Sequence, residues 1–172
     1  GQGHPMDWLS IGIMALGRAE ADEDILEDGM NLIAWMPELM ARLFMTRGGR
    51  GEIANPSNPS LGMAGNFVSM LGMEGDAAHR AERVLKSFLI LHMDHGGGNL
   101  STFAGKAVAS GRASLFASIS SAMNALSGPL HGRANQSCLE FVQKVGTSDP
   151  DQVESFVRNE LAVKRPIFGF GH

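Results

Sequence analysis

The chain has 172 residues, of which 44% are hydrophobic and 19% charged. This length and composition are typical of a folded globular protein with a sizeable core, and they exclude a disordered chain. The formal net charge of −4 disfavours a nucleic-acid partner, because such binding depends on cations that neutralise phosphates. The longest apolar run, near Phe88 to Leu91, is too short to span a bilayer, so we expect no membrane partner. One cysteine, Cys138, cannot form an intrachain disulfide, which favours a reducing compartment such as the cytoplasm.

Helical periodicity dominates the first half of the chain. The stretch "DWLSIGIMALGRAEA" predicts a helix with Asp7 as its N-cap, and a longer helix follows over residues 24–46. Pro37 lies inside this second helix and predicts a kink or a break there. "RGGRGEIANPSNPS" predicts a loop, and two shorter helices are expected over residues 60–72 and 76–94.

The second half of the chain is also predicted to be helical. "STFAGKAVASGRASLFASISSAMNAL" predicts two helices that are separated near Gly111. Their Ala, Ser and Gly faces allow helix axes to approach closely, which indicates buried packing and a contact between subunits. Two further helices are expected over residues 133–145 and 150–164. With no convincing strand pattern, the predicted class is all-α.

Two histidines end the helix predicted over residues 76–94. The apolar face of "RVLKSFLILHMDHGGGN" continues into His92, and His95 lies one turn further on, which predicts a polar pocket at this helix end. Both imidazoles are either hydrogen-bonded core residues or members of a metal site. Asp94 points away from that face and no cysteine or carboxylate cluster completes a ligand set, so no metal is expected.

The stretch "LSGPLHGRANQS" places His131 in a stiff loop, between Pro129 and Gly132 and just before a helix. The glycines allow a ligand to approach the backbone closely. The positive N-terminal end of the helix that starts near Arg133 favours a neutral imidazole. Such an imidazole can donate a hydrogen bond to a carbonyl that becomes an enolate. The stretch "PIFGFGH" repeats the pattern, with glycines before His172.

Five stretches in this order resemble the signature blocks of one family. They are "HPMDWL", "GNFVSMLG", "LHMDHGGGN-STF", "GPLHGRANQ" and "PIFGFGH", which run from His4 to His172. They are similar to blocks of the citrate synthase family, which includes 2-methylcitrate synthases. The resemblance implies an all-α homodimer or dimer-based oligomer, with a large and a small helical domain in each subunit. It also implies that acetyl-CoA or propionyl-CoA condenses with oxaloacetate, followed by hydrolysis that releases CoA.

The resemblance also implies roles for individual residues. His131 matches the histidine that hydrogen-bonds the thioester carbonyl while its enol forms, and His172 matches the one that polarises the oxaloacetate carbonyl. His95 matches a further oxaloacetate-binding histidine. The residues implied to contact CoA are Leu130, Ile167, Gly169 and Phe170, together with Arg47 as a phosphate ligand. CoA thioester is then a co-substrate, and no permanently bound cofactor is expected.

The chain departs from the family pattern in two respects. Gly96 stands where many members have Glu, and Arg133 stands where many have Gly. The catalytic aspartate and the substrate-binding arginines of the family lie beyond the last matched block, so the 172 residues alone are expected to be inactive.

The resemblance predicts most of the large domain over residues 1–133 and the start of the small domain over residues 134–172. A tricarboxylic acid cycle enzyme of the cytoplasm, or of the mitochondrial matrix in a eukaryote, is the leading hypothesis. The alternatives are a citryl-CoA-cleaving relative of the same fold, a non-catalytic helical dimerisation module and a histidine-based metal protein.

Overall fold

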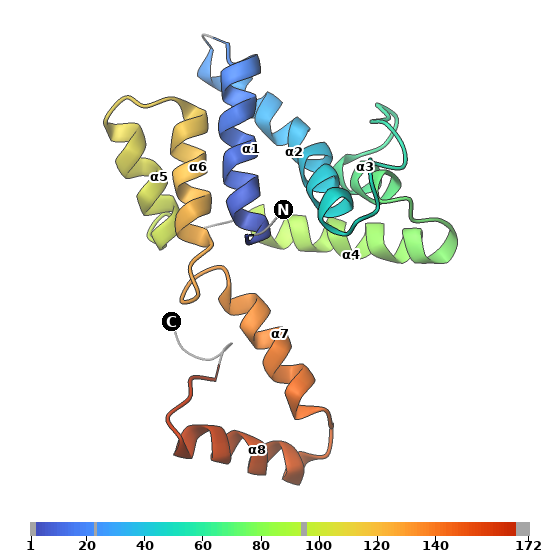
Figure 1. The fold of residues 1–172 in the computed structure, drawn as a ribbon, viewed down its shortest axis with the longest axis vertical. Helices are drawn as coiled ribbons and strands as arrows, with labels where there is room; N and C mark the ends of the chain where they lie inside the picture. Colours follow the sequence, from blue (N-terminus) through green and yellow to red (C-terminus); the bar gives the residue numbers. More distant parts are fainter. Residues whose placement is uncertain (1–2, 23, 94–95, 168–172) are drawn as a thin grey trace. The chain divides into compact units, whose positions relative to one another are not determined.

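Every regular element of the chain is an α-helix in a computed structural model that describes residues 3–22, 24–93 and 96–167 (Figure 1). In chain order the helices are α1 (Pro5–Glu20), α2 (Ile25–Arg47), α3 (Met63–Met70), α4 (Gly75–Met93), α5 (Leu100–Ser110), α6 (Leu115–Leu126), α7 (Ala134–Val145) and α8 (Pro150–Ala162). The predicted all-α class is confirmed, and α3 to α8 lie where the periodicity places helices. Within the described residues, no helix is both long enough and apolar enough to cross a membrane.

The chain divides into two compact units, Gly1–Asn124 and Ala125–His172. The first unit holds α1 to α5 and nearly all of α6, and the second holds α7 and α8. Assignment of these units to a large and a small domain, with a boundary after Arg133, stays a prediction.

Helix α1 begins earlier than its sequence pattern predicts, at Pro5 rather than after Asp7. The imidazole Nδ1 of His4 accepts a hydrogen bond from the Met6 backbone N–H at 3.2 Å. The Asp7 carboxylate in turn accepts one from the His4 N–H at 3.0 Å. Asp7 as N-cap is therefore wrong: His4 is the cap, and Asp7 is the third helical residue of a reciprocal capping box. Proline suits the first helical position because its missing N–H would have no partner there.

Helix α2 continues through Pro37 without a break. Proline removes one backbone hydrogen bond from a helix interior, which usually costs about 3 kcal/mol. Leu32, Pro37 and Ala41 are all buried along the same helix, so both halves of α2 pack into the unit. We infer that this packing offsets the lost hydrogen bond. Asp24 caps the start of α2 by accepting from the Leu26 N–H at 2.8 Å.

The core of the first unit joins α1, α2 and α6. The buried residues of this cluster are Leu9, Ile13, Leu32 and Phe116. The Phe116 ring lies directly against the backbone of α1 at Gly17, where a Cβ atom would overlap the ring. Only glycine at this position lets the two helices meet around so large a side chain.

Helix α6 lies beside both α1 and α5 (Figure 1). The buried hydroxyls of Ser10 in α1 and Ser120 in α6 are 2.6 Å apart, so one of them donates to the other. Each hydroxyl also lies within hydrogen-bond distance of the other residue's backbone carbonyl, at 3.2 Å for Ser10 and 3.0 Å for Ser120. On the other side of α6, a Cβ at Gly105 of α5 would be 3.2 Å from the Ser118 carbonyl oxygen. The small residues therefore allow the close helix approach that the sequence predicts.

The serine pair should contribute measurably to stability. Ser10→Ala removes one hydroxyl and leaves the buried Ser120 group with fewer partners, so we expect the free energy of unfolding to fall by about 1–3 kcal/mol. Urea denaturation measures this change. As a control, Ser110→Ala removes an exposed hydroxyl that bonds only within its own helix, to Ala107 at 2.7 Å. A Ser10→Ala effect no larger than that of the control would contradict the role of the pair.

Candidate active site

His131 lies in the turn between α6 and α7, in the second unit. The Gly128 carbonyl accepts hydrogen bonds from the backbone N–H of His131 at 3.0 Å and from that of Arg133 at 3.3 Å. The His131 carbonyl accepts from the Ala134 N–H at 3.0 Å, where α7 begins. These bonds hold the His131 backbone at both ends, and the residue is partly buried. The turn thus presents one imidazole on a hydrogen-bonded frame.

Gly132 has a packing role next to this imidazole. A Cβ at this position would lie 2.5 Å from the Leu126 carbonyl oxygen and 2.6 Å from its Cδ1. The chain returns so closely over the end of α6 that any side chain would push the turn outward. Ligand access alone therefore does not account for this glycine, because its close contact with α6 also requires it.

The frame around His131 should be sensitive to a single methyl group. Gly132→Ala forces the turn away from Leu126, so we expect a loss of about 1–3 kcal/mol in unfolding free energy. We also expect the His131 ring signals to shift in NMR spectra. The control is Gly29→Ala, whose added Cβ meets only a Leu115 methyl at 3.8 Å and should be neutral or stabilising. Unchanged His131 signals in the Gly132 variant would show that the turn absorbs the methyl group.

The other sequence-predicted site residues are distributed over both units. Leu130 lies beside His131 and is 89% exposed. Ile167 follows α8 and is partly buried. Arg47 ends α2 in the first unit, where it is exposed and lines a hollow of about 240 Å³ with apolar walls. His95, Gly169, Phe170 and His172 lie outside the described residues. Among the described candidates, Leu130 and His131 share one turn of the second unit.

The inward-facing position that periodicity predicts for His92 is wrong. This residue is exposed, as are Phe88 and Leu89 before it. Its Nδ1 lies 2.7 Å from the Phe88 carbonyl oxygen, and the two rings stack with centroids 3.9 Å apart. The imidazole thus has partners within its own helix. Across the described residues, no three His, Cys, Asp or Glu side chains come together in a group that fits a metal ion.

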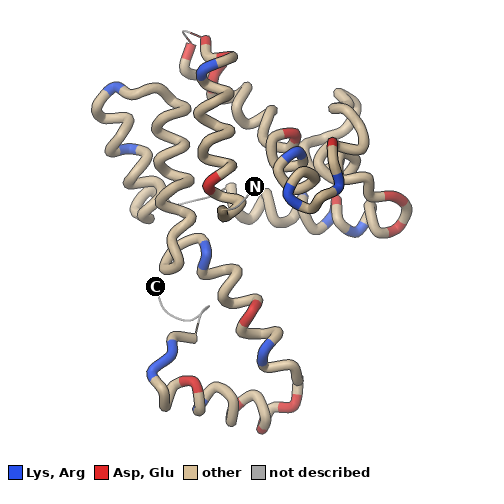
Figure 2. The backbone as a smooth tube through the Cα atoms, viewed as in Figure 1, with Lys and Arg blue, Asp and Glu red and all other residues tan. Residues whose placement is uncertain are grey.

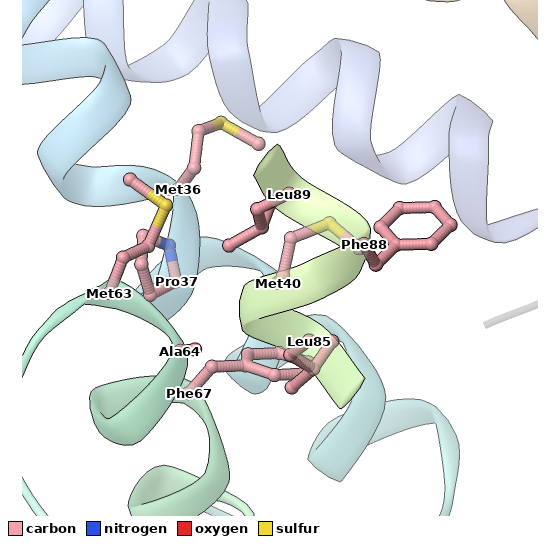
Figure 3. Close-up of a pocket in the computed structure, with 9 residues that line it drawn as sticks. All are labelled: Met36, Pro37, Met40, Met63, Ala64, Phe67, Leu85, Phe88 and Leu89. Carbon is pink, nitrogen blue, oxygen red and sulfur yellow. The ribbon is translucent and has the colours of Figure 1, made fainter. Parts of the chain in front are cut away.

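Sequence reasoning missed an apolar groove in the first unit. α2 contributes Met36, Pro37 and Met40, α3 contributes Met63, Ala64 and Phe67, and α4 contributes Leu85, Phe88 and Leu89 (Figure 3). The groove has a volume of about 200 Å³. The apolar face of α4 was visible in the sequence, but its position over α2 and α3 was not.

A second missed feature lies two residues after His131. The Nε atom of Arg133 is shielded from solvent and has no hydrogen-bond partner among the residues that the structure describes. The sequence shows that an arginine stands where many family members have glycine. That its Nε is shielded from solvent depends on the fold.

The described chain defines an all-helical protein whose candidate chemistry centres on a glycine-framed histidine at the start of a helix. Residues 1–172 match the model of the family described as "Citrate synthase, C-terminal domain". The chain belongs to the citrate synthase family.

Relatives and solved structures agree with this assignment. The chain is 35% identical to the mitochondrial 2-methylcitrate synthase of Yarrowia lipolytica, over 98% of this chain and 40% of that protein. It is also 35% identical to the citrate synthase of Acidithiobacillus ferridurans, over 99% of this chain and 45% of that protein. The crystal structure of Thermotoga maritima citrate synthase superimposes with a TM-score of 0.80 at 32% identity, covering 99% of this chain and 44% of that one.

A further solved structure supports the fold alone. It is a ternary complex of carboxymethyl coenzyme A and oxaloacetate with the citrate synthase of Thermoplasma acidophilum, with a TM-score of 0.80 at 23% identity. It covers 98% of this chain and 44% of that one. The chain spans less than half the length of each of these relatives.

Proposed function

We propose that the chain is part of an acyltransferase that condenses acetyl-CoA or propionyl-CoA with oxaloacetate, giving citrate or 2-methylcitrate and free CoA. The observation that supports this most directly is the His131 turn, a hydrogen-bonded frame that carries a partly buried imidazole in a citrate synthase family chain. A fixed donor of this kind suits a carbonyl oxygen on which charge develops during a reaction.

In the proposed reaction, His131 donates a hydrogen bond to the thioester carbonyl oxygen. A general base then removes a proton from the α-carbon of the acyl group, and the enol forms. His172 polarises the ketone of oxaloacetate, and His95 helps to bind this dicarboxylate. Leu130, Ile167, Gly169 and Phe170 would line the CoA site, and Arg47 would contact a CoA phosphate.

The bonds of the proposed reaction balance without an oxidant or a reductant. The enol carbon attacks the ketone carbon of oxaloacetate, a new carbon–carbon bond forms, and the ketone oxygen takes a proton. Water then cleaves the thioester, so that the acyl carbon gains oxygen and the CoA sulfur leaves as a thiol. No permanently bound cofactor takes part.

A dimer forms part of the proposal. Helices α4 and α5 expose large apolar side chains: Val84, Ile90, Leu91, Met93, Leu100 and Phe103. Apolar surface of this kind favours association with a second copy. We further propose a role in the tricarboxylic acid cycle, in the cytoplasm or the mitochondrial matrix.

The test is release of thiol from acetyl-CoA and from propionyl-CoA by the full native chain, with and without oxaloacetate. Thiol release that depends on oxaloacetate would support the condensing enzyme, and the two rates would give the acyl preference. Cleavage of citryl-CoA to acetyl-CoA and oxaloacetate, with no thiol released, would favour the cleaving relative. No turnover of any of these thioesters would support a non-catalytic role.

A further inference from the structure

Arg133 carries a polar atom whose partner is not found in the described chain. Its Nε is shielded from solvent and without a hydrogen bond, although the residue as a whole is only partly buried. A shielded donor that is left unpaired is costly, and more so on a charged group. Among the described residues no ion pair reaches the guanidinium either. The Arg133 guanidinium therefore lacks a hydrogen-bond acceptor for its Nε among the described residues.

The backbone links Arg133 directly to the candidate catalytic turn. The N–H groups of His131 and Arg133 donate to one and the same acceptor, the Gly128 carbonyl oxygen. Arg133 is also the N-cap residue, directly before the first residue of α7. A group bound by this side chain would thus lie at the same turn as the imidazole.

The surrounding charge favours an anion at this position. In the sequence of the second unit, no Asp or Glu occurs from Ala125 to Leu139, the stretch that contains Arg133. The first turn of α7 has no acidic residue, so the positive end of its dipole adds to the charge of the guanidinium. Figure 2 shows the start of α7 in blue, with the first red segment further along the helix. The local sequence thus contains no carboxylate that could neutralise Arg133.

We propose that Arg133 binds a carboxylate of the dicarboxylate substrate beside His131. The planar guanidinium presents Nε–H and Nη–H as a fork that matches the two oxygens of a carboxylate, and this bond would give the Nε a partner. Because the residue is partly exposed, a small anion can reach the fork after a rotation of the side chain. This inference rests on the proposed function, which supplies oxaloacetate as the anion. It adds Arg133 as a substrate-binding residue, whereas the resemblance to the family gives this residue no role.

The test compares Arg133→Gln and Arg133→Lys with the wild-type full native chain. Calorimetry measures the Kd for oxaloacetate without turnover, and thiol release gives separate KM values for oxaloacetate and acetyl-CoA. We expect Arg133→Gln to raise the Kd and the KM for oxaloacetate about 10- to 100-fold, while the KM for acetyl-CoA changes little. Arg133→Lys should recover part of the affinity, because it restores the charge without the fork. Arg83→Gln, which removes an exposed arginine of α4, is the matched control.

Thermal unfolding of each variant separates binding from folding. A folded Arg133→Gln protein with wild-type oxaloacetate affinity would overturn the inference. A lowered Tm together with unchanged affinity would do the same, because the guanidinium would then pair with a group of the protein. Should Arg133→Gln fail to fold, the Arg133→Lys affinity decides, and a wild-type value overturns the inference. If the wild-type chain neither binds oxaloacetate nor releases thiol, the proposed function itself fails, and the inference fails with it.

Discussion

Replacement of His131 by alanine is expected to lower the turnover number of the condensation about 10²- to 10³-fold. The substitution removes a donor that its frame holds in place before charge develops on the thioester oxygen. The bonds to Gly128 and from Ala134 involve only backbone atoms of His131, so the turn itself should survive. The readout is oxaloacetate-dependent thiol release by the full native chain, with the unfolding free energy measured in parallel.

The matched control for this experiment is His79→Ala, which removes an exposed imidazole from α4. Its turnover should equal that of the wild type. Near-normal turnover in His131→Ala would overturn the assigned role. A loss of stability with unchanged specific activity would show instead that His131 is a structural residue of the turn.

A second large effect is expected in the core of the first unit. Phe116 is only 1% exposed and packs against Gly17, in the cluster that joins α1, α2 and α6. Phe116→Ala should lower the free energy of unfolding by about 3–5 kcal/mol, because it removes buried apolar contacts and leaves a cavity. Chemical denaturation monitored by circular dichroism gives the value.

Phe103→Ala serves as the control for this effect. Phe103 lies in α5 and is 65% exposed, so its loss should change the free energy of unfolding of the isolated chain much less. Equal losses for the two variants would mean that α6 does not anchor α1 through Phe116. In an assembled dimer, a larger loss for Phe103→Ala than in the isolated chain would indicate that a partner covers α5.

The two effects address different parts of the chain. Phe116 supports the α1–α2–α6 core, whereas His131 follows α6 in the second unit. A Phe116→Ala protein that remains folded should therefore retain the backbone bonds of the His131 turn, which join residues of that turn and the start of α7. Retained His131 NMR signals in this variant would check that independence.

Local signals in the sequence were sufficient to predict most of the helices. The turn composition around Gly111, and the loop composition of residues 47–60, act within a few residues of the helix ends they mark. The structure has helix ends within about three residues of these signals. The His131 turn was likewise predictable as a rigid, glycine-framed loop, because Pro129 and Gly132 act on their own neighbours.

Features that depend on contacts between distant segments were not predictable in this way. The sequence alone predicts that Pro37 breaks or kinks its helix. It does not show that Leu32 and Ala41, on either side of Pro37, are buried in the continuous helix α2. Periodicity also places His92 on an apolar face of α4, yet His92 itself is exposed. Amphipathicity shows which side of a helix is apolar, and not what covers each part of that side.

The roles of Gly17 and Gly132 became clear only from the packed chain. Each lacks a side chain because another segment occupies the space: the Phe116 ring at Gly17, and the end of α6 at Gly132. The shielding of the Arg133 Nε, which has no partner in the described part of the chain, likewise depends on the residues around it. Short-range rules of backbone geometry and capping act within one or two turns and can be read from adjacent residues. Burial and close approach arise when segments far apart in the chain meet. A single sequence does not show which segments meet or how closely they pack.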